Sequence, residues 1–275
     1  MSRARANSAR RRGYALVLVT LLTMVSSMAV AVILQRHAAV RRSVVRQVEQ
    51  TRQRHIERGL REVISGWLRT VRGDSVADRL GPDGHALDIL LPEGRTVSIA
   101  MRDAQGAVLA GFDALPQEEL EQALALYEGF ASRVGPTDLE RMTRLVGPAR
   151  ISVATAPPEA VEAAVEAALG PQRAAEIAAE IREAVAEGPV TDSSLRNQTL
   201  QSAGVAPADR TAVLRLLTAE PELWELDIRI RSGLDTGRYR AQVVIPRRQS
   251  AARDGSVMSF SPLGPFLLWE RVEME

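Results

Sequence analysis

The first hydrophobic pattern along the chain is a long uncharged run near its N-terminus. The 21 residues from Tyr14 to Leu34 carry no charge, and the 13 residues before them hold five arginines and no acid. About 20 apolar residues, rising about 1.5 Å each, cross the ~30 Å hydrocarbon layer of a membrane as a helix. A helix also satisfies every backbone polar group there. The pattern therefore predicts a basic leader at residues 1–13 and a transmembrane helix at residues 14–34.

A secretory signal peptide is the alternative interpretation of the same segment. Arg10–Arg12 would supply its basic start, residues 14–25 its apolar region, and the small residues at 28–31 a cleavage site near Ala31. The apolar run continues through residues 32–34, where a signal peptide turns polar. The membrane anchor is therefore favoured, and cleavage by a signal peptidase near Ala31 stays open.

The helix is expected to continue beyond the membrane as a stem. From Tyr14 to Arg58 there is neither glycine nor proline, so nothing forces the helix to end at the membrane surface. Farther along, apolar residues recur at helical spacing between charged ones: Ile56, Leu60, Val63, Ile64, Trp67, Leu68 and Val71. The pattern predicts an amphipathic stem helix at residues 35–72, whose apolar stripe belongs to the core of the head.

Strand-like segments flank a helical block in the rest of the chain. Short strands are predicted at 87–91, 96–101 and 107–112, within a first sheet portion at 73–114. Residues 115–222 follow as a helical block, with helices predicted at 116–134, 137–145, 157–169, 171–187, 193–203 and 207–219. Thr137 and Glu140 have capping-box spacing at the start of the second of these helices.

A second sheet portion is predicted at residues 223–275. Trp224, Leu226, Ile228 and Ile230 alternate with charged residues, so one face of this strand is expected to be buried. Further strands are predicted at 239–245, 256–261 and 266–273. The fold class is therefore α+β, with a long N-terminal transmembrane and stem helix packed on an antiparallel sheet that an all-helical subdomain interrupts.

The leader and the helix after it resemble the type IV pilins and the pseudopilins of type II secretion systems. In these families a basic leader ends in a glycine, here Gly13, directly before the hydrophobic helix. The resemblance implies that a prepilin peptidase cuts after Gly13, so that Tyr14 becomes the mature N-terminus. Most members carry glutamate at the fifth mature position, which is Leu18 here. A carboxylate in a bilayer is costly unless it is paired, and the resemblance implies the N-terminal amine of a neighbouring subunit as its partner.

A subunit without this glutamate resembles the minor pseudopilin K family, whose members are proposed to cap the filament tip, where no preceding subunit offers that pairing. The segment ISVATAPPEAV at residues 151–161 is similar to the stretch of that family written INxNTAPPExL. The shared residues are Thr155, Ala156, Pro157, Pro158 and Glu159. Ser152 and Ala154 stand where the family has asparagine. The resemblance implies a distant member with a pilin-like fold.

Several kinds of chemical site are missing from the sequence. The chain has no cysteine, which excludes disulfides, thiolate zinc sites and cysteine nucleophiles. Its histidines, His37, His55 and His85, have no metal-ligand spacing. Asp192–Ser194 is interpreted as a helix cap rather than a nucleophile. The sequence therefore predicts neither an enzyme nor a cofactor, and the family resemblance leaves calcium binding open without placing its ligands.

Nucleic-acid binding is the rival from a different functional class. The chain is nearly neutral, with 35 Lys+Arg against 34 Asp+Glu, and only 4% of its residues are aromatic. Val165–Ile181, with Gly170 between two helices, has the outline of a helix-hairpin-helix unit. Residues 157–187, however, carry seven acids and two bases, a net charge of −5 that repels phosphate. Nucleic acid is therefore not expected as a partner.

The sequence and the resemblance together predict a non-enzymatic minor pseudopilin at the tip of a type II secretion pseudopilus, which initiates filament assembly for protein export. The implied location is the inner membrane, crossed once, with the head in the periplasm. The implied partners are other minor pseudopilins, through helix–helix and head contacts, together with the prepilin peptidase and the membrane. Two alternatives remain: a membrane-anchored or secreted helical adaptor, and a membrane-anchored helix-hairpin-helix DNA-binding protein.

Overall fold

The computed structural model describes residues 3–70, 76, 80–81, 83–91, 94–232, 235–245 and 266–272, with side chains from residue 17 on except at 232, 235 and 236. The chain divides into two compact units, Met1–Ile64 and Ser65–Glu275. Each unit is described by itself.

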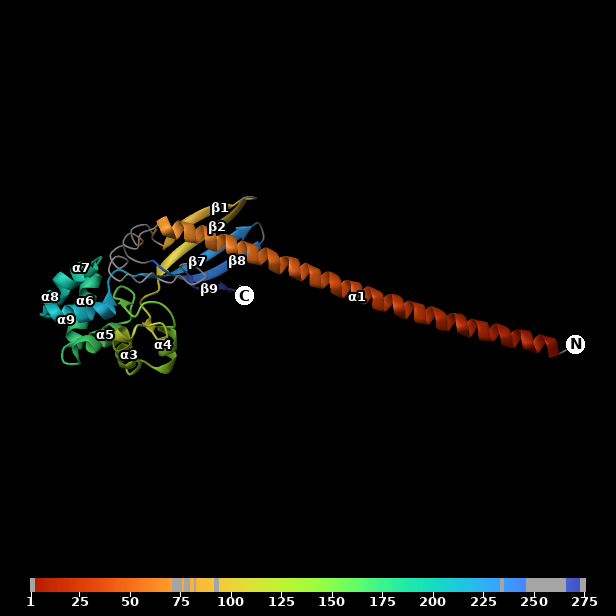
Figure 1. Ribbon diagram of the computed structural model, residues 1–275, viewed down its shortest axis with the longest axis horizontal. Coiled ribbons are helices and arrows are strands. Elements are labelled where there is room, and N and C mark those ends of the chain that lie inside the picture. Colours follow the sequence, from red (N-terminus) through yellow and green to blue (C-terminus); the bar gives the residue numbers. More distant parts are fainter. Residues whose placement is uncertain are drawn as a thin grey trace. The chain divides into compact units, whose positions relative to one another are not determined.

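One helix makes up the described part of the first unit. Helix α1 runs without a break from Arg3 to Thr70, a length of 68 residues, so its last turns belong to the second unit. Figure 1 draws it as a continuous ribbon in red and orange. The prediction that the apolar segment continues as a helical stem past residue 35 is confirmed.

An antiparallel sheet is the centre of the second unit. Its described strands lie in the order β1-β2-β7-β8-β9, and every neighbouring pair is antiparallel. The strands are β1 (His85–Leu91), β2 (Arg95–Asp103), β7 (Leu223–Ser232), β8 (Asp235–Val244) and β9 (Phe266–Val272).

The alternation predicted for β7 is confirmed. Leu226 and Ile228 are fully buried, and their register partners on β2 are Met101 and Ile99. Since successive residues of a strand face opposite sides, these apolar pairs form the buried face of the sheet.

The opposite face of the sheet is lined by cross-strand ion pairs. Arg102 of β2 and Arg240 of β8 both contact Glu225 of β7, and Arg240 also reaches Glu270 of β9 at 3.7 Å. On the same face, Asp227 receives hydrogen bonds from arginines on its own strand and on β8. This face is therefore polar and solvated, as the charged positions of the pattern indicate.

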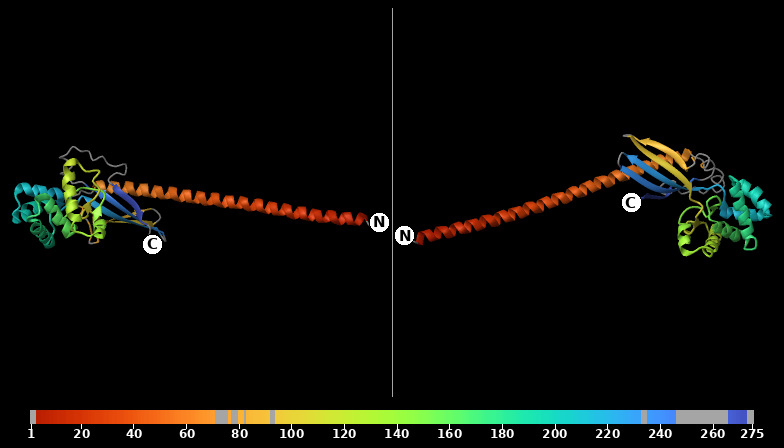
Figure 2. Two further views of the ribbon diagram at one scale, coloured as in Figure 1. Left: turned by 90° about the horizontal axis from the view of Figure 1, so that it is seen from below. Right: turned by 180° about the vertical axis from the view of Figure 1, so that it is seen from behind.

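A helical block interrupts the sheet between two neighbouring strands. β2 pairs with β7 although residues 104–222 separate them in sequence. The block contains α3 (Gln117–Ala131), α4 (Pro136–Arg141), α5 (Pro158–Leu169), α6 (Ala174–Glu187), α7 (Asp192–Ser194), a π-helical turn (Leu195–Thr199), α8 (Leu200–Ser202) and α9 (Pro207–Leu216). Figure 2 shows these helices gathered at one end of the sheet in both views. The α+β class with a helical insertion is therefore confirmed.

The insertion has its own hydrophobic core. Its largest fully buried side chains include Phe130 of α3, Ile181 of α6 and Leu216 of α9, and α5 contributes Val161 and Val165. The longer helices α3, α5, α6 and α9 each present an apolar stripe to this common core, so the insertion is a packed subdomain rather than an extended loop.

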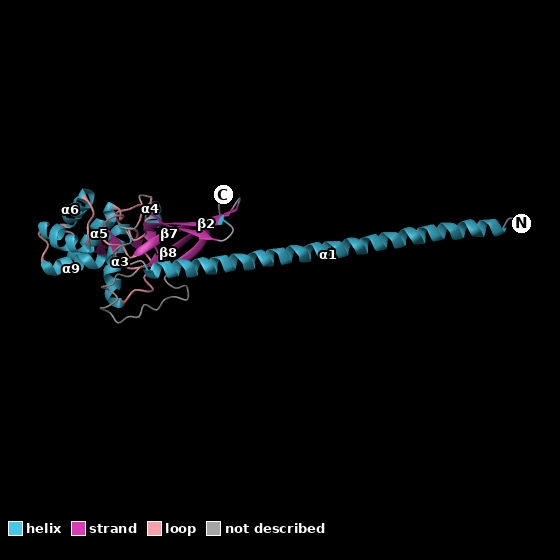
Figure 3. Ribbon diagram, turned by 90° about the horizontal axis from the view of Figure 1, so that it is seen from above, coloured by secondary structure: helices cyan, strands magenta, loops and turns pink. Residues whose placement is uncertain are grey.

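Besides its helices, the insertion contains two short pairs of parallel strands that hold its loops together. β3 (Val108–Leu109) pairs with β4 (Thr143–Arg144), and β5 (Ile151–Ser152) pairs with β6 (Leu217–Thr218), both in parallel. In Figure 3 the strands of the main sheet stand out in magenta beside the cyan helices.

These strand pairs correct one predicted strand. The segment 107–112 was expected in the first sheet portion, but β3 lies outside the five-stranded sheet. Its backbone instead bonds to the segment after α4, with Val108 N–H donating to the Met142 carbonyl at 2.9 Å and Ala110 N–H to the Arg144 carbonyl at 2.7 Å. Since a Cβ on Gly111 would overlap the Leu145 carbonyl, glycine permits this close approach.

Two further predictions of local structure differ from the fold. The helix expected at 137–145 is α4, which begins at Pro136 and ends at Arg141. Gly135 occupies its N-cap position and no side chain caps it, so the capping-box interpretation of Thr137 and Glu140 is wrong. Proline at the first helical position needs no hydrogen-bond partner for its nitrogen. The strand predicted at 256–261 lies outside the described residues.

Candidate functional site

The N-terminal half of α1 has the composition and exposure of a membrane span. Its most apolar 18-residue window has a mean hydropathy of 2.5, and none of that window is buried within the structure. The hydroxyls of Thr20, Thr23 and Ser27 all donate to backbone carbonyls of the same helix, over 2.8–3.1 Å. These three hydroxyls are therefore bonded within the helix, as a lipid environment requires. One helix of the described chain is long and apolar enough to cross a membrane.

The residues of the predicted processing site lie in this helix. The backbone of Gly13 and Tyr14 is helical, and their side chains lie outside the description. Leu18 is 53% exposed on the helix surface. The position where the pilin families place glutamate therefore carries an apolar side chain that faces outward from α1.

The stem half of α1 is buried on one face, as predicted, but the prediction fails for one residue of the apolar stripe. Leu60, Ile64 and Leu68 are buried and lie four residues apart, on one face of the helix. Trp67 is half-buried, but Val63 is 48% exposed. The expectation that Val63 belongs to the core is wrong, because the fully buried residues follow the row of Leu60, Ile64 and Leu68 and Val63 lies to one side of it.

The TAPPE segment connects a buried strand to helix α5. Ser152, the last residue of β5, is fully buried, and its carbonyl accepts a hydrogen bond from the Ala156 N–H at 2.9 Å. Pro157 has extended backbone at the N-cap of α5, and Pro158 is the first helical residue. Glu159 lies in the first turn, where a negative charge suits the helix dipole. The motif is therefore a tight turn that starts a helix.

Thr155 fixes this turn to the end of the sheet. Its hydroxyl donates to Asp103 Oδ2 at 2.8 Å, while Asp103 Oδ1 accepts the Gln105 N–H at 2.7 Å. A Cβ on Gly106 would overlap Thr155, so glycine is needed where the two segments touch. The family-motif residues, far from β2 in sequence, thus contact the point where the chain leaves β2.

Gln105 joins the three chain segments at this junction. Its side-chain oxygen accepts hydrogen bonds from the N–H groups of Glu222 at 2.7 Å and Leu223 at 3.0 Å. Its side-chain nitrogen donates to the Arg150 carbonyl at 2.9 Å, and its own carbonyl accepts the Ser152 N–H at 2.9 Å. Gln105 is fully buried, so these bonds replace all of its contact with water and hold the insertion to the sheet.

Arg144 is buried beside this junction, and within the described part of the chain no carboxylate forms an ion pair with it. Its guanidinium donates to the carbonyls of Ala107 at 3.0 Å and Val146 at 2.8 Å, and also to those of Pro148 and Arg150. Burial lowers the pKa of Arg144 to about 10, although the charge of Asp103 acts in the opposite direction. The side chain therefore orders the loop that follows α4.

A hollow of about 340 Å³ opens where the sheet meets the insertion. Sheet residues including Arg102 and Glu225 line one side, and Arg141, Thr155 and Pro157 of the insertion line another. Both signs of charge face this hollow, which gives it no preference for an anion or a cation. We therefore assign it the role of a solvated seam.

Asp192 and the serines after it lie at the start of a helix, but Asp192 is the first helical residue and not the cap that was predicted. Thr191 is the N-cap of α7 and makes a reciprocal pair of hydrogen bonds with Ser194. Asp192 accepts from the Thr218 hydroxyl at 3.0 Å and from the Ala219 N–H at 2.6 Å. The carboxylate therefore links α7 to β6 and is not oriented toward a serine nucleophile.

Among the described residues, no three His, Asp or Glu side chains form a group that could hold a metal ion. His85 lies 3.5 Å from Asp88, and both side chains are about half exposed. In the helix-hairpin-helix outline, Gly170 ends α5 with φ +87°, a turn that favours glycine.

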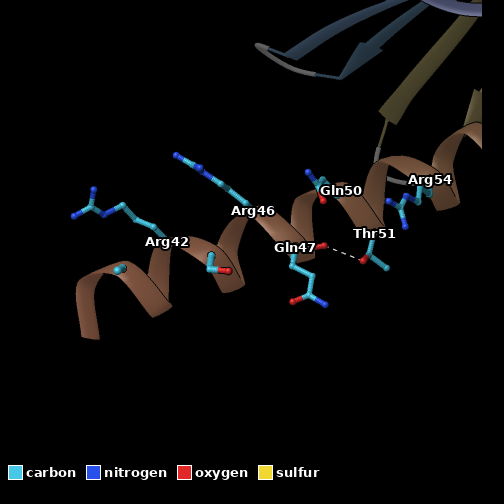
Figure 4. A pocket seen from close by; sticks show the side chains of 8 residues that line it. Arg42, Arg46, Gln47, Gln50, Thr51 and Arg54 are labelled. Carbon is cyan, nitrogen blue, oxygen red and sulfur yellow. Dashed lines mark hydrogen bonds between the residues drawn. The ribbon is translucent and has the colours of Figure 1, made fainter. Parts of the chain in front are cut away.

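A second hollow lies on the stem itself and is open on all but one side. Figure 4 shows its lining side chains, including Arg42, Arg46 and Arg54, all rising from one stretch of α1. Thr51 donates to the Gln47 carbonyl at 2.8 Å within the same helix. A surface of one convex helix encloses no ligand, so this hollow is a feature of exposed side chains.

The comparisons with known proteins add one structural likeness. No family model and no curated protein matches the chain. The crystal structure of the GspK–GspI–GspJ complex from the type 2 secretion system of enterotoxigenic Escherichia coli contains a similar chain, with a TM-score of 0.42 and 13% identity. The match covers 82% of this chain and 100% of that chain. A likeness of this degree does not by itself establish a shared fold or family.

Proposed function

We propose that this protein is a non-enzymatic subunit of a secretion pseudopilus, anchored in the inner membrane by α1 with its head in the periplasm. The observation that carries the proposal is the unbroken helix α1, which is uncharged from Tyr14 to Leu34 and becomes one-sided near Leu60. A single rod of this kind supplies both a membrane anchor and a helix that can bundle with those of other subunits. The division into leader, span, stem, split sheet and insertion is part of this proposal.

Position at the filament tip is the finer part of the proposal. Leu18 leaves the span without the carboxylate that would pair with the amine of a preceding subunit, and an unpaired carboxylate in lipid is costly. A subunit that lacks this group needs no subunit ahead of it. The tip is the place in a filament where that condition is met.

The insertion supports the same placement. Gln105 and Asp103 tie residues 104–222 to the edge of β2 and β7, so the subdomain is a fixed bulky attachment to the sheet. A bulky attachment is accommodated at the end of a filament, where no further subunit stacks on it. The partners we propose are other minor pseudopilins and the prepilin peptidase.

Co-purification tests the proposed role. The full chain, purified in mild detergent from cells that make the other minor pseudopilins, is expected to retain them in fixed proportion. A chain that purifies alone under conditions where the other subunits remain associated would contradict it and favour an unpartnered adaptor.

The Leu18→Glu variant tests the tip position. In a tip subunit the new carboxylate meets no amine and is costly in lipid, so pseudopilus number and export of the secreted protein should fall severalfold. The matched Leu18→Val variant adds no charge and should behave as the wild type. Unchanged or increased assembly with Leu18→Glu would place the subunit inside the filament instead.

A further inference from the structure

A ring of arginines surrounds α1 directly after its apolar span. Arg36, Arg41, Arg42 and Arg46 are all exposed, and residues 35–48 contain no acid. Among the described residues none of the four takes part in an ion pair. We call these four residues the arginine ring.

The ring has no single face. At about 100° per residue, Arg41, Arg42 and Arg46 point about 140°, 240° and 280° around the helix from Arg36. Figure 4 shows Arg42 and Arg46 extended away from the helix axis. A partner helix or a folded domain would contact one side of α1, whereas charges on all sides suit a surrounding layer.

Distance from the span places the ring at the membrane surface. Counting about 1.5 Å per residue from Leu34, Arg36 lies about 3 Å and Arg42 about 12 Å beyond the apolar run. The headgroup layer is roughly 6 Å thick on each side, and the Debye length is about 8 Å at physiological salt. Side chains on a helix also lean toward its N-terminus, which here is the direction of the bilayer. The guanidinium groups of Arg36, Arg41 and Arg42 therefore reach the phosphates of the lipid headgroups. Arg46, about 18 Å beyond the apolar run, acts on them over roughly a Debye length.

The residues between the arginines fit the same zone. Val40, Val44, Val45 and Val48 are all more than half exposed. A helix surface that mixes exposed valine with arginine suits the interface, where apolar stems contact lipid and charged ends contact headgroups. The charge pattern changes farther along, because Glu49 and Glu57 accompany the next arginines.

We propose that the arginine ring binds the headgroups of anionic phospholipids in the leaflet through which the stem leaves the membrane. The inference rests on the membrane span of the proposed function, but not on any filament role. Bound headgroups would fix the depth of α1 and gather anionic lipid around the stem.

Energy transfer from the protein to labelled lipids tests the ring. Because the chain has no cysteine, Ala38→Cys gives a single site for a donor dye on the full chain. The protein is reconstituted in vesicles of phosphatidylcholine with 25 mol% phosphatidylglycerol. One preparation contains a trace of acceptor-labelled phosphatidylglycerol, and a second contains a trace of acceptor-labelled phosphatidylcholine. Each arginine near the surface strengthens binding to anionic lipid about fivefold. Energy transfer to phosphatidylglycerol should therefore exceed energy transfer to phosphatidylcholine at least threefold, and this excess should shrink in 0.5 M salt.

Two variants test whether lipid binding depends on the arginine ring or on the basic stem in general. Changing all four ring arginines to glutamine should bring the ratio close to one. The matched variant R52Q/R54Q/R58Q removes three arginines farther along the stem, and its ratio should stay at the wild-type value. A wild-type ratio near one, or an equal loss in both variants, would overturn the inference.

The remaining outcomes are also decisive. Loss of the excess on adding a short DNA duplex at 0.15 M salt would overturn the inference in favour of nucleic acid. If the chain transfers energy to neither lipid, the membrane span is wrong and the proposed function fails with it. Strong, equal transfer to both lipids would overturn the proposed lipid binding by the arginine ring but would leave the membrane span intact.

Discussion

The side-chain oxygen of Gln105 accepts a hydrogen bond from the backbone N–H of Leu223, 3.0 Å away, although the whole helical insertion separates the two residues in sequence. The same oxygen holds the N–H of Glu222 at 2.7 Å. One neutral side chain therefore closes the loop that carries the insertion, and it does so where β2 ends beside the start of β7.

Replacement of Gln105 by methionine keeps the side-chain volume but removes every side-chain hydrogen bond. Two backbone N–H groups would remain buried without partners, at about 1–3 kcal/mol each, and the Arg150 carbonyl would keep only its bond from Arg144. Because such losses overlap, we expect the free energy of unfolding to fall by about 3 kcal/mol, measured by denaturant titration of the full chain in detergent. The control Gln201→Met, at an exposed glutamine, should change it by less than about 0.5 kcal/mol. Equal effects of the two changes would refute the role of Gln105.

Two paired hydroxyls predict opposite mutational outcomes. Ser152 and Thr218 are register partners on β5 and β6, and both are fully buried. Thr218 donates to Asp192 and to the Glu220 carbonyl, whereas Ser152 Oγ has no hydrogen-bond partner among the described residues. Thr218→Val should therefore destabilise by about 2 kcal/mol, and Ser152→Ala should be neutral or stabilise by up to about 1 kcal/mol. Thermal unfolding of both variants checks this contrast, and a large loss from Ser152→Ala would contradict it.

Arginine at position 144 should not be replaceable by lysine. The guanidinium reaches four carbonyls in different directions, and an ammonium group cannot match that spread. Arg144→Lys keeps the buried charge but loses most of the bonds, so we expect a loss of about 3 kcal/mol at pH 7, at least as large as for Arg144→Met.

The pH dependence of Arg144→Lys gives an independent check. Burial lowers the pKa of Arg144 itself to about 10, and it lowers the pKa of a lysine there below its ordinary value of ~10.4. Between the lowered pKa of this lysine in the folded chain and its ordinary pKa in the unfolded chain, the unfolded chain binds more protons than the folded one. The stability of the lysine variant therefore rises with pH in that range. Relative to Arg144→Met it should recover stability as pH increases from 7 to 10. A flat difference across that range would contradict the buried position.

Asp227 should contribute to stability at neutral pH but not in acid. Burial acts to raise its pKa, but hydrogen bonds from Arg238 and Arg229 outweigh this and lower it. A carboxyl whose folded pKa is depressed stabilises above its unfolded pKa of ~3.9, and this contribution is lost as pH falls through the folded pKa. Asp227→Asn should therefore cost about 1 kcal/mol at pH 7, and this cost should shrink as the pH falls below ~3.9.

Acid titration of unfolding measures the effect. The control Asp83→Asn, at an exposed position, should follow the wild-type curve at every pH. A constant cost of Asp227→Asn from pH 7 to pH 2 would show that packing, rather than charge, is the cause.

The sequence pattern predicted the parts of the fold that depend on periodicity. The charge-free run predicted the span of α1, and the alternation around Leu226 and Ile228 predicted the buried face of β7. Proline placed the start of α5 to within one residue, since Pro158 is its first helical residue. These signals are local, because each depends only on neighbouring residues.

The junction could not be predicted in the same way. Gln105 follows Asp103 in what looks like an ordinary polar turn, and Arg144 looks like the end of an amphipathic helix. Their roles arise from carbonyls and N–H groups of distant segments, for which a single sequence gives no signal. The β3 segment was misassigned for the same reason, because its partner β4 lies beyond a helix.

The mature N-terminus is the measurement that tests the central claim most directly. Intact mass and N-terminal sequencing of the chain purified from membranes of cells with a prepilin peptidase should give a protein that begins at Tyr14, and Gly13→Leu should leave the leader attached. A start near Val32 would show a signal peptide and no anchor, and an intact Met1 would show a plain membrane anchor. Either result would contradict the proposal that this chain is a pseudopilin.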